Sequence, residues 1–384
     1  MTRDRIRWIA PLLAAATTLA AATVLIALRG IIFSPDSGAY DDASTALLAV
    51  GLDYAAWLQG DLGLHYAGFV TALALLKIAF GTGWSTALIV LNLIALATAA
   101  LAVSRTIAGL QVPSPFVLLS VIAVAGLYDV VQWAPYALSD PVFIAAVTVC
   151  ACIAGTSGSW RGQHLAAFAA AAVVGVAWRP TGVVLLGYLL VLPLVLPRLS
   201  SPSPRVRRMT LGAMILLSVV AFAIFAAVMQ DITLLPDQAR PFMESMVKHY
   251  YDAGEVVYDR PATYHSPPSG YLDYLLLVFD RWLHFFWVTA EGHSVAHVVY
   301  GLAVRAPIMV LAALAVTRLA SARPIERDDA HLIASVLCLV WVFSSAHGML
   351  QVDYDWRYRA PVMPSMACLA LLMLGRCLWR RQAL

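Results

Sequence analysis

The chain has 384 residues, of which 61% are hydrophobic and 12% charged, and its formal net charge is +3. A soluble globular domain is about one-quarter charged, so this composition and a mean hydropathy of +0.79 exclude an ordinary water-soluble fold. The small net charge gives no indication of a nucleic-acid partner. All five cysteines lie inside or at the ends of apolar runs, without the spacing of a zinc site.

Apolar runs near 20 residues recur along the sequence, and a helix needs this length to cross ~30 Å of hydrocarbon. They do not alternate between apolar and polar residues, as the strands of a membrane barrel do. We therefore predict an all-α polytopic integral membrane protein, with a single transmembrane domain over residues 1–384. The predicted spans are roughly 8–28, 84–104, 114–128, 137–155, 163–178, 180–197, 209–229, 295–318, 331–348 and 360–378.

The first span follows Arg3, Arg5 and Arg7 and is too long for an ordinary signal peptide, so we interpret it as an uncleaved helix. The positive-inside rule decides the placement of the short apolar segment 66–80. If 66–80 lies at the outer interface, both termini and the arginine-rich helix ends are cytoplasmic, whereas a crossing would scatter the arginines over both sides. These arginines are Arg105, Arg161, Arg198, Arg205, Arg207, Arg208, Arg318, Arg323, Arg327, Arg376, Arg380 and Arg381.

This topology predicts four extracytoplasmic features, each of which joins two spans. They are the first loop 29–83 with interfacial helices, the turn 128–139, the large loop 230–294 with an amphipathic stretch at 271–287, and the last turn 351–360. We expect any chemistry on this side, because the cytoplasmic loops are short and resemble no catalytic module.

The first loop carries Asp36, Tyr40 and Asp41 directly after a span. A carboxylate at the membrane surface can take a proton from an acceptor hydroxyl or hold a cation. The alternative interpretation is structural, with Asp36, which follows Pro35, as the N-cap of a helix.

Two further charged residues stand at the ends of spans. Asp140 lies in Ser139-Asp140-Pro141, which is also an ordinary helix start. Arg179 separates two apolar runs, where an arginine needs a partner or a water-filled cavity unless it snorkels to the interface.

The last outer turn contains Arg357 and Arg359 among aromatic residues, an arrangement that suits a phosphate at headgroup level. Asp353 and Asp355 resemble the acidic pair that binds a metal–nucleotide sugar, but those donors are cytoplasmic and this turn is predicted outside. The structural alternative pairs the aspartates with the arginines and assigns the aromatic residues to the membrane belt.

Histidines are concentrated in and after the large loop. His265 can line an acceptor pocket or simply lie on the surface, and the sequence does not decide between the two. His293 and His297 share one helical face, but no third ligand accompanies them. We therefore assign no metal site and no cofactor, and leave a divalent metal requirement open.

Taken in order, the acidic first loop, Ser139-Asp140-Pro141, Arg179-Pro180-Thr181-Gly182 and Arg357-Tyr358-Arg359-Ala360-Pro361 resemble a known family. This series is similar to the GT-C superfamily of membrane glycosyltransferases, especially bacterial relatives of the protein O-mannosyltransferases and the lipid A aminoarabinose transferase. The segment 281–287, followed by His293 and His297, also looks like the second outer loop of small bacterial members. The patches are short, but as an ordered series they cover most of the chain.

The resemblance implies a multi-pass enzyme of the bacterial cytoplasmic membrane, which moves a hexosyl or pentosyl group from a polyprenyl-phosphate carrier to an acceptor outside. It implies Asp36 as the catalytic residue, and a single base with direct displacement predicts inversion. An arginine is needed for the departing lipid phosphate. The predicted substrate- and lipid-phosphate-binding residues are Tyr40, Asp41, Asp140, Arg179, Arg357, Arg359 and His265. The carboxylate pair of the protein mannosyltransferases is not clearly reproduced, so a glycan, a glycolipid and a protein all stay open as acceptors.

Two other classes compete with this interpretation. An O-antigen polymerase or ligase uses arginines and a histidine in a large outer loop, and the loop here holds Arg240, Arg260 and Arg281. Such an enzyme would not need the acidic first loop. A transporter or lipid flippase predicts polar residues near the middle of several spans, where this sequence is nearly all apolar with Asn92 as a rare exception.

Overall fold

The computed structural model describes residues 3–58, 66–156, 162–258, 260–290, 293–350 and 355–379, and helices dominate it. Four residues named above lie outside the described residues: Arg161, Asp353, Arg380 and Arg381. The prediction of an all-α fold is confirmed.

Among the described residues, seven helical stretches are long and apolar enough to cross a membrane. These stretches comprise α1 (Arg3–Arg29), α4 (Ala67–Phe80) with α5 (Trp84–Gly109), α6 (Ser114–Ala123) with α7 (Tyr128–Val131), α10 (Gly182–Leu199), α11 (Pro204–Gln230), α15 (Val295–Tyr300) with α16 (Ala306–Ala320), and α17 (Arg327–Leu350). Three shorter apolar helices are α8 (Asp140–Ala154), α9 (Gly162–Trp178) and α19 (Met363–Trp379). By helix length and hydropathy, this is a multi-pass membrane protein.

The ten predicted spans all fall on these helices, and the remaining helices belong to the connections. They are α2 (Pro35–Ala49), α3 (Tyr54–Leu58), α12 (Arg240–Met243), α13 (His249–Asp252), α14 (Tyr271–His284) and α18 (Asp355–Arg359). Helix α14 coincides with most of the predicted amphipathic stretch 271–287.

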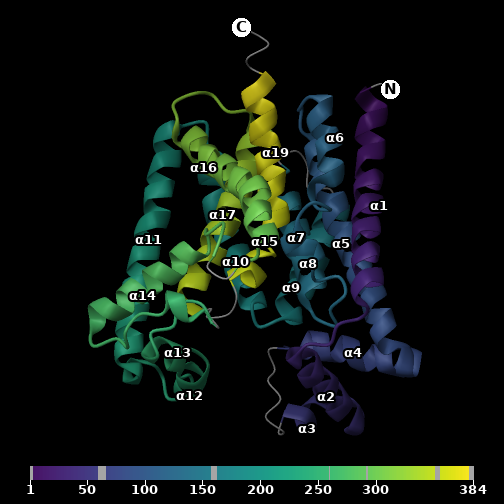
Figure 1. Cartoon of the computed structure of the whole chain (residues 1–384). Coiled ribbons are helices and arrows are strands. Elements are labelled where there is room, and N and C mark those ends of the chain that lie inside the picture. Colours follow the sequence, from purple (N-terminus) through teal and green to yellow (C-terminus); the bar gives the residue numbers. More distant parts are fainter. Residues whose placement is uncertain are drawn as a thin grey trace.

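One end of the bundle carries both groups of connecting helices. Figure 1 shows α2, α3 and α4 below one side of the bundle and α12 and α13 below the other, whereas α1 begins and α19 ends at the opposite end. Helix α4 lies across the bundle end in this view. Gly81, at φ 55°, and the 3₁₀ turn Gly81–Gly83 break the helix between α4 and α5. The segment 66–80 therefore does not continue α5 in a straight line.

Helices α8 and α17 lie at the centre of the packing, while α11 lies at its edge. In the most apolar stretch of α17, 67% of the residues are buried, compared with 17% in the corresponding stretch of α11. Nearly every residue of α8 is buried as well. Residues at the ends of α8 and α17 are therefore held by packing from several sides, and Asp140 is the first residue of α8.

A buried ion pair inside the bundle was not predicted from the sequence. Arg305 lies in a π-helical turn, Gly301–Arg305, and donates to both carboxylate oxygens of Asp129 at 2.5 and 2.8 Å. Both side chains are almost fully buried. The predicted span 295–318 therefore contains a charged residue, Arg305, which the statement that the middles of the spans are nearly all apolar overlooked.

Candidate functional site

Asp36 and Arg357 meet at the end of the bundle that carries α2. Helix α2 begins at Pro35, and its N-cap is Ser34, whose hydroxyl accepts from the Ser37 amide. The interpretation of Asp36 as the cap is therefore wrong, and its carboxylate is available for another partner. Its Oδ2 lies 2.8 Å from Nη2 of Arg357 in α18, and 45% of the Asp36 side chain is exposed.

Asp140 lies behind this contact and joins two arginines. Its carboxylate accepts from Arg179, which stands between α9 and α10, and lies 3.4 and 3.5 Å from Nε and Nη2 of Arg357. Only 1% of the Asp140 side chain is exposed, and Arg179 is buried too. Arg179 therefore does not snorkel. The hydroxyl of Ser139 makes no capping bond to α8, and Asp140, besides starting this helix, contacts two arginines.

Asp36, Asp140, Arg179 and Arg357 form what we call the Asp–Arg cluster. Two cations and two anions balance formally, and a buried charge is tolerated only with such partners. Burial alone lowers the pKa of the Arg357 guanidinium, but Asp140, Tyr358 and Asp36 together raise this pKa above its ordinary value. Arg357 is therefore a permanent cation, and Asp36 is the more exposed of its two carboxylate partners.

Aromatic side chains enclose the cluster. The guanidinium carbon of Arg357 lies 5.6 Å from the centre of the Trp133 ring, within the range of a cation–π contact. Tyr40, one helical turn after Asp36, packs against Tyr66 and Phe69 with ring centres 4.8 and 5.0 Å away. Burial and the neighbouring Tyr66 raise the pKa of the Tyr40 phenol above its ordinary value. Tyr40 is therefore neutral and keeps its proton.

A narrow cavity adjoins Arg179 and Arg357. It is lined by Phe143, Arg179, Thr181, Val184, Phe343, Ala346, His347, Arg357, Tyr358 and Pro361. Its free volume is about 10 Å³, which is about the space of one water molecule. A sugar or phosphate can enter only if lining side chains move apart.

No family model, no curated protein and no solved structure matches the chain. A functional assignment therefore depends on the Asp–Arg cluster and its surroundings.

Three other residues of the predicted site have different partners. Asp41 forms an ion pair with Lys77 of α4 at 2.6 Å. His265 lies on the surface with Nε2 2.8 Å from Oδ2 of Asp280. Arg359 is fully buried and donates to the carbonyls of Phe285 and Trp287 at 2.9 and 2.7 Å. The structure therefore brings Asp36, Tyr40, Asp140, Arg179 and Arg357 together, and not these three.

Sequence reasoning missed two residues of the site, Trp133 and His347. Trp133 lies in the predicted outer turn 128–139, to which the sequence analysis assigned no functional residue. His347 interrupts the apolar run of α17 close to its end, next to Ser344 and Ser345. A histidine at such a position was a usable signal, since polar residues within spans are generally functional.

Among the described residues, no group of three or more His, Cys, Asp or Glu side chains is placed to hold a metal ion. His293 and His297 have ring centres 5.7 Å apart, and one nitrogen of each already has a local partner. The charged groups of the cluster can instead bind an anion at Arg357 and accept a proton at Asp36.

Proposed function

We propose that this protein is a glycosyltransferase of the bacterial cytoplasmic membrane, similar in design to the GT-C superfamily. In this proposal it transfers a sugar from a polyprenyl-phosphate carrier to an acceptor at the outer face. One observation supports this proposal most strongly: Asp36 of the first loop and Arg357 of the last turn lie 2.8 Å apart. Such a pair provides a base and an anion-binding group at one place, and both are needed for this transfer.

The proposed topology has ten spans, with both termini in the cytoplasm. Helix α4 then lies at the outer interface, and the bundle end with α2 and α12–α14 faces the outside. The distribution of arginines favours this orientation, since the cytoplasmic helix ends would carry most of them. Under this topology the Asp–Arg cluster lies at headgroup depth, where the phosphate of a lipid carrier resides.

The reaction begins with the donor phosphate at Arg357. Its oxygens compete with the Asp36 carboxylate for Nη2, so donor binding releases Asp36 from its ion pair. Asp36 then accepts the proton of the acceptor hydroxyl. The acceptor oxygen attacks the anomeric carbon as the bond from that carbon to the phosphate oxygen breaks, and the lipid phosphate departs with the electron pair. Because the attack comes from the face opposite the leaving group, the anomeric configuration inverts.

Asp140 is assigned a positioning role in this scheme. It is buried and contacts both arginines, so it fixes Arg357 in place and compensates the charge of Arg179. Preorganised cations stabilise a departing anion without reorganisation during the reaction. The narrow cavity beside Arg357 adds one requirement, because any part of the donor that enters it must displace lining side chains.

The arginines of the large loop give less support to the O-antigen polymerase or ligase alternative. Arg281 is buried and donates to the carbonyl of Glu255, and Arg240 donates to the carbonyls of Leu235 and Thr233. Both arginines thus form hydrogen bonds to the backbone of the large loop and stabilise its conformation. The transporter alternative gains one buried pair, Asp129–Arg305, but its two charges satisfy each other.

The decisive experiment measures sugar transfer directly. Purified protein in vesicles is incubated with radiolabelled polyprenyl-phosphate sugar and an extract of envelope glycans, glycolipids and proteins. We expect label to reach an acceptor with wild-type protein and not with Asp36→Asn. Asp42→Asn is the matched control, because Asp42 is an exposed carboxylate of the same helix. Vesicle uptake without transfer, or full transfer by Asp36→Asn, would contradict the proposal.

A further inference from the structure

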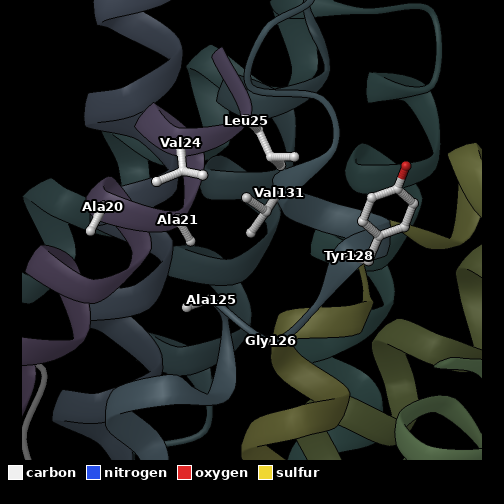
Figure 2. A pocket seen from close by; sticks show the side chains of 8 residues that line it. All are labelled: Ala20, Ala21, Val24, Leu25, Ala125, Gly126, Tyr128 and Val131. Carbon is white, nitrogen blue, oxygen red and sulfur yellow. The ribbon is translucent and has the colours of Figure 1, made fainter. Parts of the chain in front are cut away.

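An open apolar groove runs between α1 and the segment that connects α6 to α7. Figure 2 shows its walls, which come from α1 on one side and from the α6–α7 connection and α7 on the other. The lining residues are Ala20, Ala21, Val24, Leu25, Ala125, Gly126, Tyr128 and Val131. The volume is about 440 Å³, within the range of small-molecule sites.

The groove arises because α6 ends while α1 continues. The hydroxyl of Thr17 donates to the carbonyl of Val121 at 2.7 Å and holds the two helices together. Beyond this bond α6 stops at Ala123 and the chain turns, whereas α1 remains helical as far as Arg29. Small side chains on both walls leave the space between them unfilled.

One end of the groove is polar and positively charged. Tyr128 lines the groove, and its hydroxyl accepts from Nη2 of Arg29 at 3.2 Å, which leaves the phenol proton free to donate. Arg29 is exposed at the end of α1, and none of the ion pairs within the described part of the chain includes it. This end therefore offers an uncompensated cation and a hydrogen-bond donor to an anion.

The outer face of α1 borders the groove and is apolar. Val24 and Leu28 are 57% and 77% exposed, as expected for side chains that face lipid. A ligand of this groove must therefore have an apolar chain and an anionic group at one end. Bilayer phospholipids have this chemistry, and they surround the groove at high concentration.

We propose that the groove binds an anionic phospholipid, with one acyl chain between α1 and α6–α7 and the phosphate at Arg29 and Tyr128. The site is separate from the Asp–Arg cluster and does not depend on the proposed glycosyl transfer. The lipid fills the gap where α1 loses its contact with α6. It thereby supports Tyr128, the neighbour in sequence of the buried Asp129–Arg305 pair.

Native mass spectrometry of the full chain tests this site. Purified protein is given phosphatidylglycerol and phosphatidylcholine in equal amounts, and the lipids that stay bound are weighed. We expect wild-type protein to prefer phosphatidylglycerol by about fivefold, since one basic residue near a membrane is worth ≈ 1 kcal/mol. Arg29→Gln should lose this preference, while Arg208→Gln, at an exposed arginine near the start of α11, should keep it.

A second variant tests the apolar wall. Val24→Trp places an indole in the groove and should lower retention of both lipids, whereas Val90→Trp, at an exposed valine of α5, should not. Size-exclusion profiles and melting temperatures check that each variant is folded. Unchanged lipid preference in Arg29→Gln would overturn the proposal. A second result would also overturn it: equimolar polyprenyl phosphate displaces phosphatidylglycerol from wild type but not from Val24→Trp, in which the groove is blocked. The groove would then be a site for the carrier lipid.

Discussion

Arg357 donates to Asp36 at 2.8 Å, although the two residues lie in the last and the first loop of the chain. The same guanidinium approaches the buried Asp140, so Arg357 is shared between an exposed carboxylate and an enclosed one. The contact with Asp140 is protected from solvent, whereas the contact with Asp36 is open to exchange. An incoming phosphate should therefore replace Asp36 and not Asp140.

The first prediction concerns Asp36→Asn. Removal of this carboxylate eliminates the competitor for Arg357, so polyprenyl phosphate should bind more tightly, by no more than about fivefold, since exposed ion pairs are worth at most ~1 kcal/mol. Sugar transfer should be lost at the same time, because Asn cannot accept the proton. Titration of polyprenyl phosphate against both proteins measures the affinity, with Asp42→Asn as control. Weaker binding by Asp36→Asn would show that no competition takes place.

The second prediction compares two arginines of α18. Arg357→Lys replaces a forked donor by a compact ammonium that cannot reach both carboxylates, so kcat should fall on the order of 10²–10³-fold with little change in melting temperature. Arg359→Lys should do the reverse, because Arg359 holds the carbonyls of Phe285 and Trp287. Turnover and thermal unfolding of both variants provide the comparison. If both lose activity in proportion to their loss of stability, Arg357 has only a structural role.

The helical fold could be predicted from the sequence because apolar length is a strong signal. Within the site, residue types and positions near helix ends identified Asp36, Asp140, Arg179 and Arg357. The sequence analysis wrongly placed Asp41 in the site, although helical periodicity predicts that it lies on another face of the helix. Asp36 and Tyr40 are one turn apart and share a face, while Asp41 points to Lys77. Arg359 could not be distinguished from Arg357, because their different partners depend on the fold of a distant loop.

The third prediction concerns Asp140→Asn. This change leaves Arg179 buried without a counter-charge, and removal of one partner of a buried pair costs about 3–5 kcal/mol. The variant should therefore melt well below wild type. The double variant Asp140→Leu with Arg179→Met should recover much of that stability, since two apolar residues leave no buried charge. Asp328→Asn, at an exposed carboxylate in the first turn of α17, is the control. Equal melting of Asp140→Asn and wild type would contradict the buried ion pair.

The fourth prediction separates stability from activity at the Asp129–Arg305 pair. Both groups are almost fully buried and satisfy each other, so Asp129→Asn should also destabilise the protein by about 3–5 kcal/mol. Transfer per folded molecule should be unchanged, because neither residue is part of the Asp–Arg cluster. Activity is measured below the melting transition and divided by the folded fraction. A loss of turnover beyond the unfolded fraction would mean that this pair takes part in the function.

The last prediction concerns the orientation, on which the proposed chemistry depends. Asp42 and Asp237 belong to the first and the large loop, and both are exposed, while the exposed native Cys377 lies near the end of α19, at the opposite end of the bundle. Asp42→Cys and Asp237→Cys, made in a Cys377→Ser background, should react with a membrane-impermeant maleimide on intact spheroplasts. Cys377 in the native chain should react only after permeabilisation. The four other cysteines are buried and should stay silent. If Asp42→Cys were labelled only after permeabilisation, the Asp–Arg cluster would face the cytoplasm, and a lipid-linked sugar at the outer face could not be its donor.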